Sequence, residues 1–158
     1  MLNYVKGDIT TTTDRVILHG VNCQGKFNAG VAKALRHKFP SVYNDYMAYV
    51  GRRPNKSLLG KIIVSGIPEV TPPNFIVHCF TQLYYGREVG HQYVDYAAIA
   101  TCLDSFHTWY QWPNKSLVYS VSMPKIGCGL GGGDWSIVQA IVQKHLVDCG
   151  VTVNVWEL

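Results

Sequence analysis

The segment Met123–Trp135 constrains the fold more than any other part of this chain. Five of its thirteen residues are glycine, and it joins a strand-like stretch, Ser116–Ser122, to a helical pattern that begins after Asp134. Glycine lets a backbone approach a ligand without interference from a Cβ atom, and a helix N-terminus offers unpaired N–H groups to an anion. The junction therefore predicts an α/β protein that binds a phosphate-bearing ligand.

A second junction of the same kind lies near the N-terminus. The apolar run Val16–Val21 leads into a loop that contains Gly25 and Gly30, and apolar residues at helical spacing follow this loop. Glycines often serve only to make turns, but two glycine-bearing helix N-termini favour one ligand with a diphosphate.

The remaining pattern alternates strands with helices. Apolar runs predict strands at Leu2–Val5, Val16–Val21, Lys61–Ile67, Phe75–Phe80, Leu117–Val121 and Val151–Trp156. Helical spacing appears after Gly30, again after Pro40, and over Tyr96–Tyr110, where Asp95 is placed as a cap. Strands rich in Val and Ile with weak alternation predict a sheet covered on both faces, which is a three-layer α/β/α architecture.

Composition limits the possible partners. With 158 residues, 47% of them hydrophobic, residues 1–158 are expected to form a single domain with one core. The 14 basic and 10 acidic residues give a net charge of +4, and the basic residues are scattered along the sequence. This balance suits an anionic small molecule and is weak support for nucleic acid binding.

Cysteine and histidine spacing argue against metal sites and disulfides. The five cysteines include no C-x-x-C pair, and the six histidines form no short-spaced set, so no metal ion and no cofactor is expected. The same cysteine usage suits a reducing, cytoplasmic location. The chain shows no signal peptide and no apolar stretch of membrane-spanning length, so we expect a soluble protein without a membrane partner.

Four segments together resemble the macrodomain family of ADP-ribose-binding modules over nearly the whole chain. They are Tyr4–Ile9, His19–Ala32, Phe80–Gln82 and Pro124–Trp135. Each is a weak signal alone, but their order and the elements between them are specific. The resemblance implies a mixed, mostly parallel sheet of about six strands. It is strongest to the branch that contains ADP-ribose 1''-phosphate phosphatases and the terminal ADP-ribose-protein glycohydrolase.

The resemblance also implies roles for individual residues. Asp8 would accept a hydrogen bond from the adenine amino group beside the backbone of Ile9, Asn22 would contact the distal ribose, and Thr81 would lie at the ligand. The diphosphate would lie against the backbone of Gly30, Val31, Ala32, Gly127, Cys128, Gly129, Leu130 and Gly131. Without the resemblance, Asp8 would be interpreted as a turn or cap residue.

Departures from the family patterns bear on the expected reaction. Ala32 stands where one class of mono-ADP-ribosyl hydrolases carries an acidic residue. Gln82 and Gly131 stand where the terminal glycohydrolase uses a lysine and an aspartate, and Gln82 has no amine to form a covalent adduct. The pattern that remains is that of the phosphatases, with His19 and Asp134 as candidate catalytic groups.

Each catalytic candidate has a structural alternative. His19 could transfer a proton near neutral pH or be a core histidine, and Asp134 could orient water or cap the following helix. Cys23 and Cys128 are expected to pack as small residues rather than act as nucleophiles. Arg87 could pair with phosphate, but a solvated loop arginine is the more common case.

The sequence thus predicts a protein that binds ADP-ribose or a derivative and removes the phosphate from ADP-ribose 1''-phosphate. Two alternatives stay open. One is an ADP-ribosyl hydrolase that acts on protein or nucleic acid, which would be the only role for nucleic acid, and the other is a non-catalytic ADP-ribose reader. The oligomeric state is left open.

Overall fold

The computed structural model describes residues 1–111 and 120–158. Within these ranges the strands are β1 (Leu2–Lys6), β2 (Val16–Asn22), β3 (Ile62–Gly66), β4 (Phe75–Gln82), β5 (Ser120–Pro124) and β6 (Thr152–Glu157). The helices are η1 (Ile9–Thr11), α1 (Gly30–Lys38), α2 (Pro40–Val50), α3 (Asn55–Leu58), α4 (Tyr96–Gln111), α5 (Trp135–His145) and η2 (Val147–Cys149).

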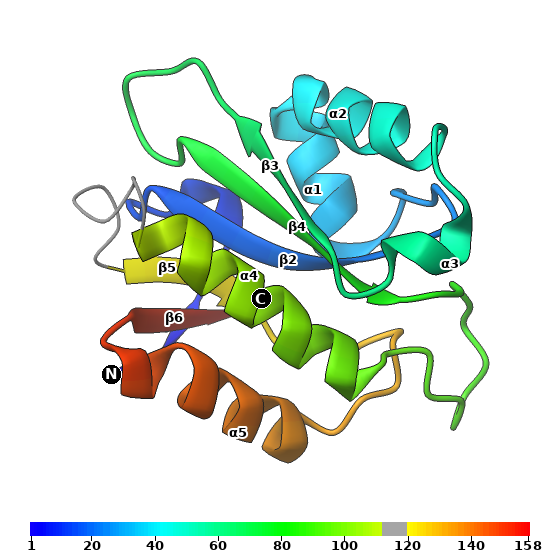
Figure 1. Ribbon diagram of the computed structural model, residues 1–158. Coiled ribbons are helices and arrows are strands. Elements are labelled where there is room, and N and C mark those ends of the chain that lie inside the picture. The colour runs from blue at the N-terminus through cyan, green and yellow to red at the C-terminus, as the bar shows by residue number, and fades with distance from the viewer. Residues whose placement is uncertain (112–119) are drawn as a thin grey trace.

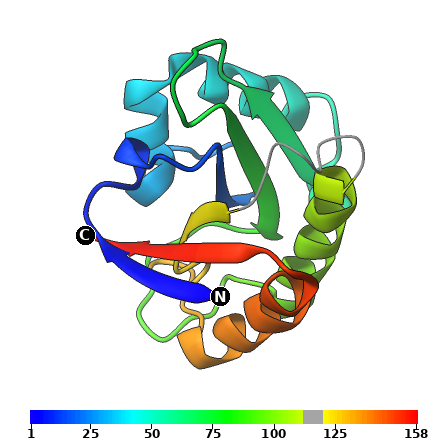
Figure 2. The ribbon, with the colours of Figure 1, turned by 90° about the vertical axis from the view of Figure 1, so that its left-hand side faces the viewer.

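The six strands form one mixed sheet in the order β1-β6-β5-β2-β4-β3. All neighbouring pairs are parallel except β3 and β4, which pair antiparallel. Strands β1 and β6 come from opposite ends of the chain and lie side by side at one edge (Figure 2). Because β2, β4 and β5 are parallel, their carboxyl ends meet at the same edge of the sheet, where ligands of such folds bind.

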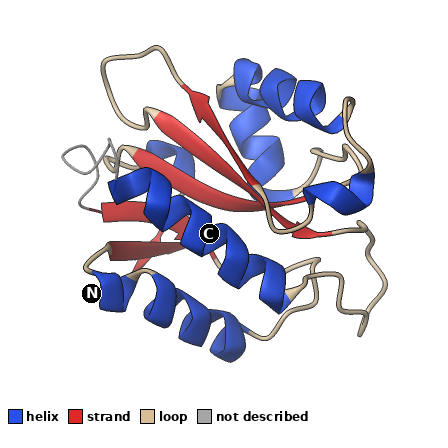
Figure 3. Cartoon of the chain, viewed as in Figure 1, coloured by secondary structure: helices blue, strands red, loops and turns tan. Residues whose placement is uncertain are grey.

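Helices cover both faces of the sheet, as Figure 1 and Figure 3 show. Alternating residues of β2 divide between two cores: Leu18 packs with residues of α4 and α5, whereas Ile17 packs with residues of α1 and α2. Leu18 and Ile17 are both fully buried. A sheet buried on both faces explains why its central strands show little polar alternation, and the predicted three-layer α/β/α architecture is confirmed.

Local capping fixes where several helices begin. The Asp95 carboxylate accepts a hydrogen bond from Ala98 N at 3.0 Å ahead of α4, as the sequence predicted. Helix α2 begins at Pro40, where a missing N–H costs nothing. The structure also contains α3, which the sequence pattern did not predict, because one helical turn is too short to show periodicity.

The strand predicted at Leu117–Val121 lies largely outside the described residues. Its described part is β5, which continues to Pro124 at the point where the glycine-rich segment begins. In the part of the chain that the structure describes, no helix is both long and apolar enough to cross a membrane.

Candidate functional site

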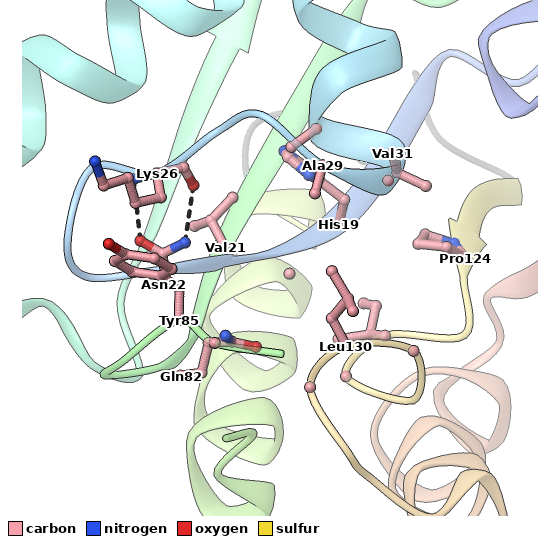
Figure 4. Close-up of a pocket in the computed structure, with 18 of the residues that line it drawn as sticks. His19, Val21, Asn22, Lys26, Ala29, Val31, Gln82, Tyr85, Pro124 and Leu130 are labelled. Carbon is pink, nitrogen blue, oxygen red and sulfur yellow. Dashed lines mark hydrogen bonds between the residues drawn. The ribbon is translucent and has the colours of Figure 1, made fainter. Parts of the chain in front are cut away.

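A cavity of about 310 Å³ lies at the carboxyl ends of β2, β4 and β5 (Figure 4). Three segments line it: the end of β2 with the loop into α1, the segment that follows β4, and the glycine-rich loop after β5. Both glycine junctions singled out in the sequence therefore face the same space. The cavity is large enough for a nucleotide-sized ligand.

One wall of the cavity is the N-terminus of α1. Gly30, Val31 and Ala32 line the space, and Gly30 has a φ of +56°, a conformation that favours glycine. The N-cap residue, Ala29, makes no side-chain capping hydrogen bond. The first N–H groups of α1 have no partner within the helix, so this wall offers hydrogen-bond donors and the positive end of the helix dipole to an anion.

The opposite wall is the glycine-rich loop, from which Gly127, Gly129, Leu130 and Gly131 line the cavity. A Cβ atom at Gly127 would lie 2.4 Å from Val94 Cγ2, and the φ of Gly127 is +75°. A Cβ atom at Gly131 would lie 2.6 Å from the carbonyl oxygen of Gly127. Glycine is thus required at positions 127 and 131 by the tight packing of the loop itself.

The glycine-rich loop is bound to the segment that precedes α4. The N–H groups of Tyr93 and Val94 both donate to the carbonyl oxygen of Gly131, at 2.8 Å and 3.1 Å. A Cβ atom at Gly132 would lie 2.1 Å from the carbonyl oxygen of His91. The two segments therefore form one packed unit beneath the cavity.

Asn22, expected at the distal ribose, lines the cavity but holds its own loop together. Its Oδ1 accepts from the N–H groups of Gln24 and Lys26 and from the Tyr46 hydroxyl, and its Nδ2 donates to the carbonyl oxygen of Lys26 at 2.8 Å. Figure 4 shows the two bonds between Asn22 and Lys26 as dashed lines. The side chain is 7% exposed, so its main observed role is to fix the loop after β2.

His19 lines the cavity, yet its ring is buried in the core beneath α1. Its Nε2 lies 2.8 Å from His78 Nδ1, its ring packs edge-on against Phe27, and no hydrogen-bond partner is described for its Nδ1. Burial, reinforced by His78, holds the pKa of His19 well below its usual range. A neutral imidazole can form hydrogen bonds but does not supply a proton at neutral pH.

Asp134 lies outside the cavity lining, on an exposed turn. Its Oδ1 accepts from the hydroxyl of Ser136 at 2.7 Å and from the N–H of Ser136 at 2.9 Å, and these bonds lower the pKa of the Asp134 carboxyl. These are the contacts of a helix N-cap, the role predicted from the sequence as the alternative to catalysis. They give no support to the catalytic prediction.

Asp8, Ile9, Thr81 and Cys128 were also expected at the ligand, and the structure places none of them in the cavity lining. Asp8 caps η1, since its Oδ1 accepts from the hydroxyl and the N–H of Thr10, and the hydroxyl bond is the main cause of its lowered pKa. Thr81 is buried behind the β2 strand, where a Cβ at Gly20 would lie 2.7 Å from Thr81 Oγ1.

The cysteines near the two loops are poor nucleophiles. Burial raises the pKa of both Cys23 and Cys128 to about 11, so both thiols stay protonated at neutral pH. Among the described residues, no group of three or more His, Cys, Asp or Glu side chains is placed to hold a metal ion.

The charged side chains that line the cavity are all cationic: Lys26, Arg87 and Lys125. Lys125 forms an ion pair with Glu157, and Lys26 Nζ lies 5.6 Å from the centroid of the Tyr85 ring. The sequence pattern did not single out Lys26 or Tyr85. Figure 4 shows Lys26, Asn22 and Tyr85 together at one end of the cavity, with Pro124 at the other.

Comparison with known proteins connects this geometry to a family. The family model described as Macro domain matches residues 18–142. A Candida albicans protein named ADP-ribose 1''-phosphate phosphatase is 30% identical over 152 residues, which cover 91% of this chain and 93% of that protein. A Mycobacterium tuberculosis protein named DNA ADP-ribosyl glycohydrolase is 24% identical over 139 residues, which cover 88% of this chain and 37% of that protein.

A solved structure shares the whole architecture. The macrodomain of Mycobacterium tuberculosis DarG superposes with a TM-score of 0.84 at 21% identity, and the match covers 100% of this chain and 98% of that one. At this identity the similarity establishes the fold.

Proposed function

The chain belongs to the macrodomain family, and on this basis we propose that its cavity binds ADP-ribose and that the protein hydrolyses ADP-ribose 1''-phosphate to ADP-ribose and phosphate. The observation that carries the proposal is the placement of two glycine-bearing turns on opposite walls of one cavity. Gly30, Val31 and Ala32 present N–H groups from one side, and the loop from Gly127 to Gly131 faces them. A diphosphate held between these walls would be bound mainly by backbone amides.

The rest of the ligand can be oriented from the two ends of the cavity. We propose that adenosine lies at the Pro124 end, with the Asp8 carboxylate and the backbone of Ile9, which lie outside the cavity lining, as its partners. The distal ribose would then lie at the end formed by Asn22, Lys26 and Tyr85. The large contribution of backbone groups explains how the site can bind with few polar side chains.

The charge of the cavity favours a phosphorylated ribose at that end. Lys26 and Arg87 line the cavity, and no carboxylate does so among the described residues. A phosphomonoester carries a further negative charge, which these cations would stabilise and which an acidic residue would repel. The relative named ADP-ribose 1''-phosphate phosphatase supports the same substrate.

Hydrolysis would proceed by attack of water on phosphorus, with the bond to the ribose oxygen breaking and that oxygen taking a proton. The cations and backbone N–H groups would stabilise the phosphoryl oxygens, so we propose that electrostatic stabilisation is the main contribution of the site. His19 would take part as a neutral hydrogen-bonding group, consistent with its lowered pKa. Asp134 would contribute only indirectly, because its bond from the N–H of Ser136 fixes the start of α5.

The proposal is tested by calorimetric titration with ADP-ribose, followed by measurement of phosphate released from ADP-ribose 1''-phosphate. Binding with phosphate release supports the proposal. Tight binding without turnover on any ADP-ribose derivative would instead identify a reader. Release of ADP-ribose from modified DNA or protein, without phosphate release, would identify the hydrolase that the relative named DNA ADP-ribosyl glycohydrolase suggests.

A further inference from the structure

More than half of the basic residues lie on one helical layer of the fold. Residues 26–61 hold eight of the 14 Lys and Arg residues and one of the ten Asp and Glu residues. This segment forms α1, α2 and α3 on one face of the sheet (Figure 1). All eight basic residues are exposed: Lys26, Lys33, Arg36, Lys38, Arg52, Arg53, Lys56 and Lys61. The α4–α5 layer has no comparable excess of basic over acidic residues. The positive charge is therefore concentrated on one side of the sheet.

Part of this layer adjoins the ligand cavity. A second hollow of about 430 Å³ is lined by Phe27, Asn28, Lys33, Arg36 and His37. Asn28 also lines the main cavity, so the two hollows meet at this residue. We name Lys26, Lys33, Arg36 and His37 the α1 track, because they lead from the cavity along the flank of α1.

Two cations of the α1 track lie against aromatic rings of neighbouring segments. The guanidinium carbon of Arg36 lies 3.6 Å from the centroid of the Tyr43 ring, and Lys26 Nζ lies 5.6 Å from that of Tyr85. Tyr85 is 50% exposed. Surfaces that bind single-stranded nucleic acids combine cations for the phosphates with exposed rings on which bases stack. The core of a protein–protein interface is usually apolar, whereas the described lining of the second hollow has Phe27 as its only large apolar side chain, itself 2% exposed.

We propose that the α1 track binds a single-stranded nucleic acid, whose phosphates contact Lys33 and Arg36. A single strand fits better than a duplex, because its unpaired bases can stack on an exposed ring such as Tyr85. This binding does not depend on the proposed function.

The test uses fluorescence anisotropy with a labelled, unmodified single-stranded DNA of about 12 nucleotides, which is long enough to cover one binding surface. The test variant is the double substitution Lys33→Gln with Arg36→Gln. The matched control is Lys6→Gln with Lys144→Gln, which removes the same charge from exposed residues outside the basic layer. ADP-ribose affinity is measured on all three proteins by calorimetry, and thermal unfolding confirms that each is folded.

The wild-type protein should bind the oligonucleotide with an affinity that falls steeply with salt. The test variant should bind about tenfold more weakly, and its slope of log K against log salt should be shallower by about 1.4, as expected for two lost phosphate contacts. The control should change affinity by less than about twofold. Arg36→Lys should keep the salt slope, because it retains the charge. ADP-ribose affinity should be equal in all proteins.

Three results would overturn the inference: no salt-dependent binding by the wild-type protein, equal losses in the test and control variants, or equal affinity for duplex and single-stranded DNA. Equal losses would mean that only net charge attracts the strand. Failure of ADP-ribose to bind, with the track still active, would instead count against the proposed function alone.

Discussion

His19 Nε2 lies 2.8 Å from His78 Nδ1 in the buried face of the sheet beneath α1 and α2. The two residues stand opposite each other in the parallel pair of β2 and β4, and His78 Nε2 lies 2.9 Å from the Ser65 hydroxyl on β3. One ring must donate to the other, so the contact requires that one of the facing nitrogens be unprotonated. Burial lowers the pKa of His78 to about 3, consistent with two neutral rings.

This pair makes stability depend on pH. Both histidines are neutral in the folded protein, whereas in the unfolded chain each takes up a proton near pH 6.5. Their neutral state therefore costs no free energy above pH 6.5, and the free energy of unfolding falls as the pH decreases from 6.5 toward 3. The loss should approach about 1.4 kcal/mol per pH unit for each histidine.

Denaturant unfolding at several pH values between 6.5 and 5 measures this slope. His78→Gln removes one of the two groups and should give a shallower slope, although its stability at pH 7 will be lower because a buried contact is lost. Identical slopes for wild type and His78→Gln would contradict this account.

Asn22→Ala should lower both stability and ADP-ribose affinity. The substitution removes bonds to the backbone of Gln24 and Lys26 and to Tyr46, at a cost of about 2 kcal/mol, which corresponds to a decrease in Tm of roughly 4–8 °C. Asn55→Ala, at an exposed site on α3, is the matched control and should change neither property. If Asn22→Ala lost affinity at unchanged Tm, a direct contact with the ribose would explain the effect better than loop disorder.

Gly129→Ala tests whether the ligand lies against the backbone of the glycine-rich loop. A Cβ atom at Gly129 meets nothing within 4 Å, so the variant should fold with wild-type stability. It should nevertheless bind ADP-ribose at least about tenfold more weakly, because the added methyl group separates the diphosphate from the amides. Gly66→Ala, at an equally open site on β3, should keep full affinity. Unaltered binding by Gly129→Ala would move the diphosphate away from this loop.

Asp134→Asn separates capping from catalysis. Asparagine caps a helix about as well as aspartate, so this variant should keep the wild-type Tm and, if Asp134 is only a cap, the wild-type rate of phosphate release. Asp134→Ala should lower the Tm by about 2–4 °C. A large loss of kcat in Asp134→Asn with normal Tm and KM would restore the catalytic role predicted from the sequence.

Lys26→Met should distinguish phosphorylated from unphosphorylated ligand. Affinity for ADP-ribose 1''-phosphate should fall about tenfold, and affinity for ADP-ribose should fall by less than about threefold, since only the former places a charge at the Lys26 end. The control is Lys144→Met, at an exposed position of α5, which should change the affinity for neither ligand. An equal loss for both ligands would place Lys26 at the diphosphate instead.

The fold and the general position of the site could be predicted from the sequence because the relevant signals are local. Glycine clusters between a strand and a helix, Asp95 ahead of α4 and Pro40 at the start of α2 each act within a few residues of their own position. Their effects do not depend on distant packing. The resemblance to a family then implied a mixed, mostly parallel sheet of about six strands, as observed.

The contacts of individual side chains could not be predicted in the same way. Nothing near His19 in the sequence indicates that His78, 59 residues later, would hold its ring in the core and keep it neutral. Nor does the sequence show that the Asn22 side chain forms hydrogen bonds within its own loop, or that the basic residues of α1 and α3 lie in one layer. These properties arise only when the strands and helices pack together.

The hydrogen bonds from the N–H groups of Tyr93 and Val94 to the Gly131 carbonyl oxygen join residues 86–94 and 127–133 into one unit, so neither segment can change shape alone. A chain that lengthened or reshaped one of these segments would lose the backbone geometry of the other, even without touching it in sequence. Swapping the glycine-rich loop for that of a relative should therefore succeed only when the segment ahead of α4 is transplanted with it.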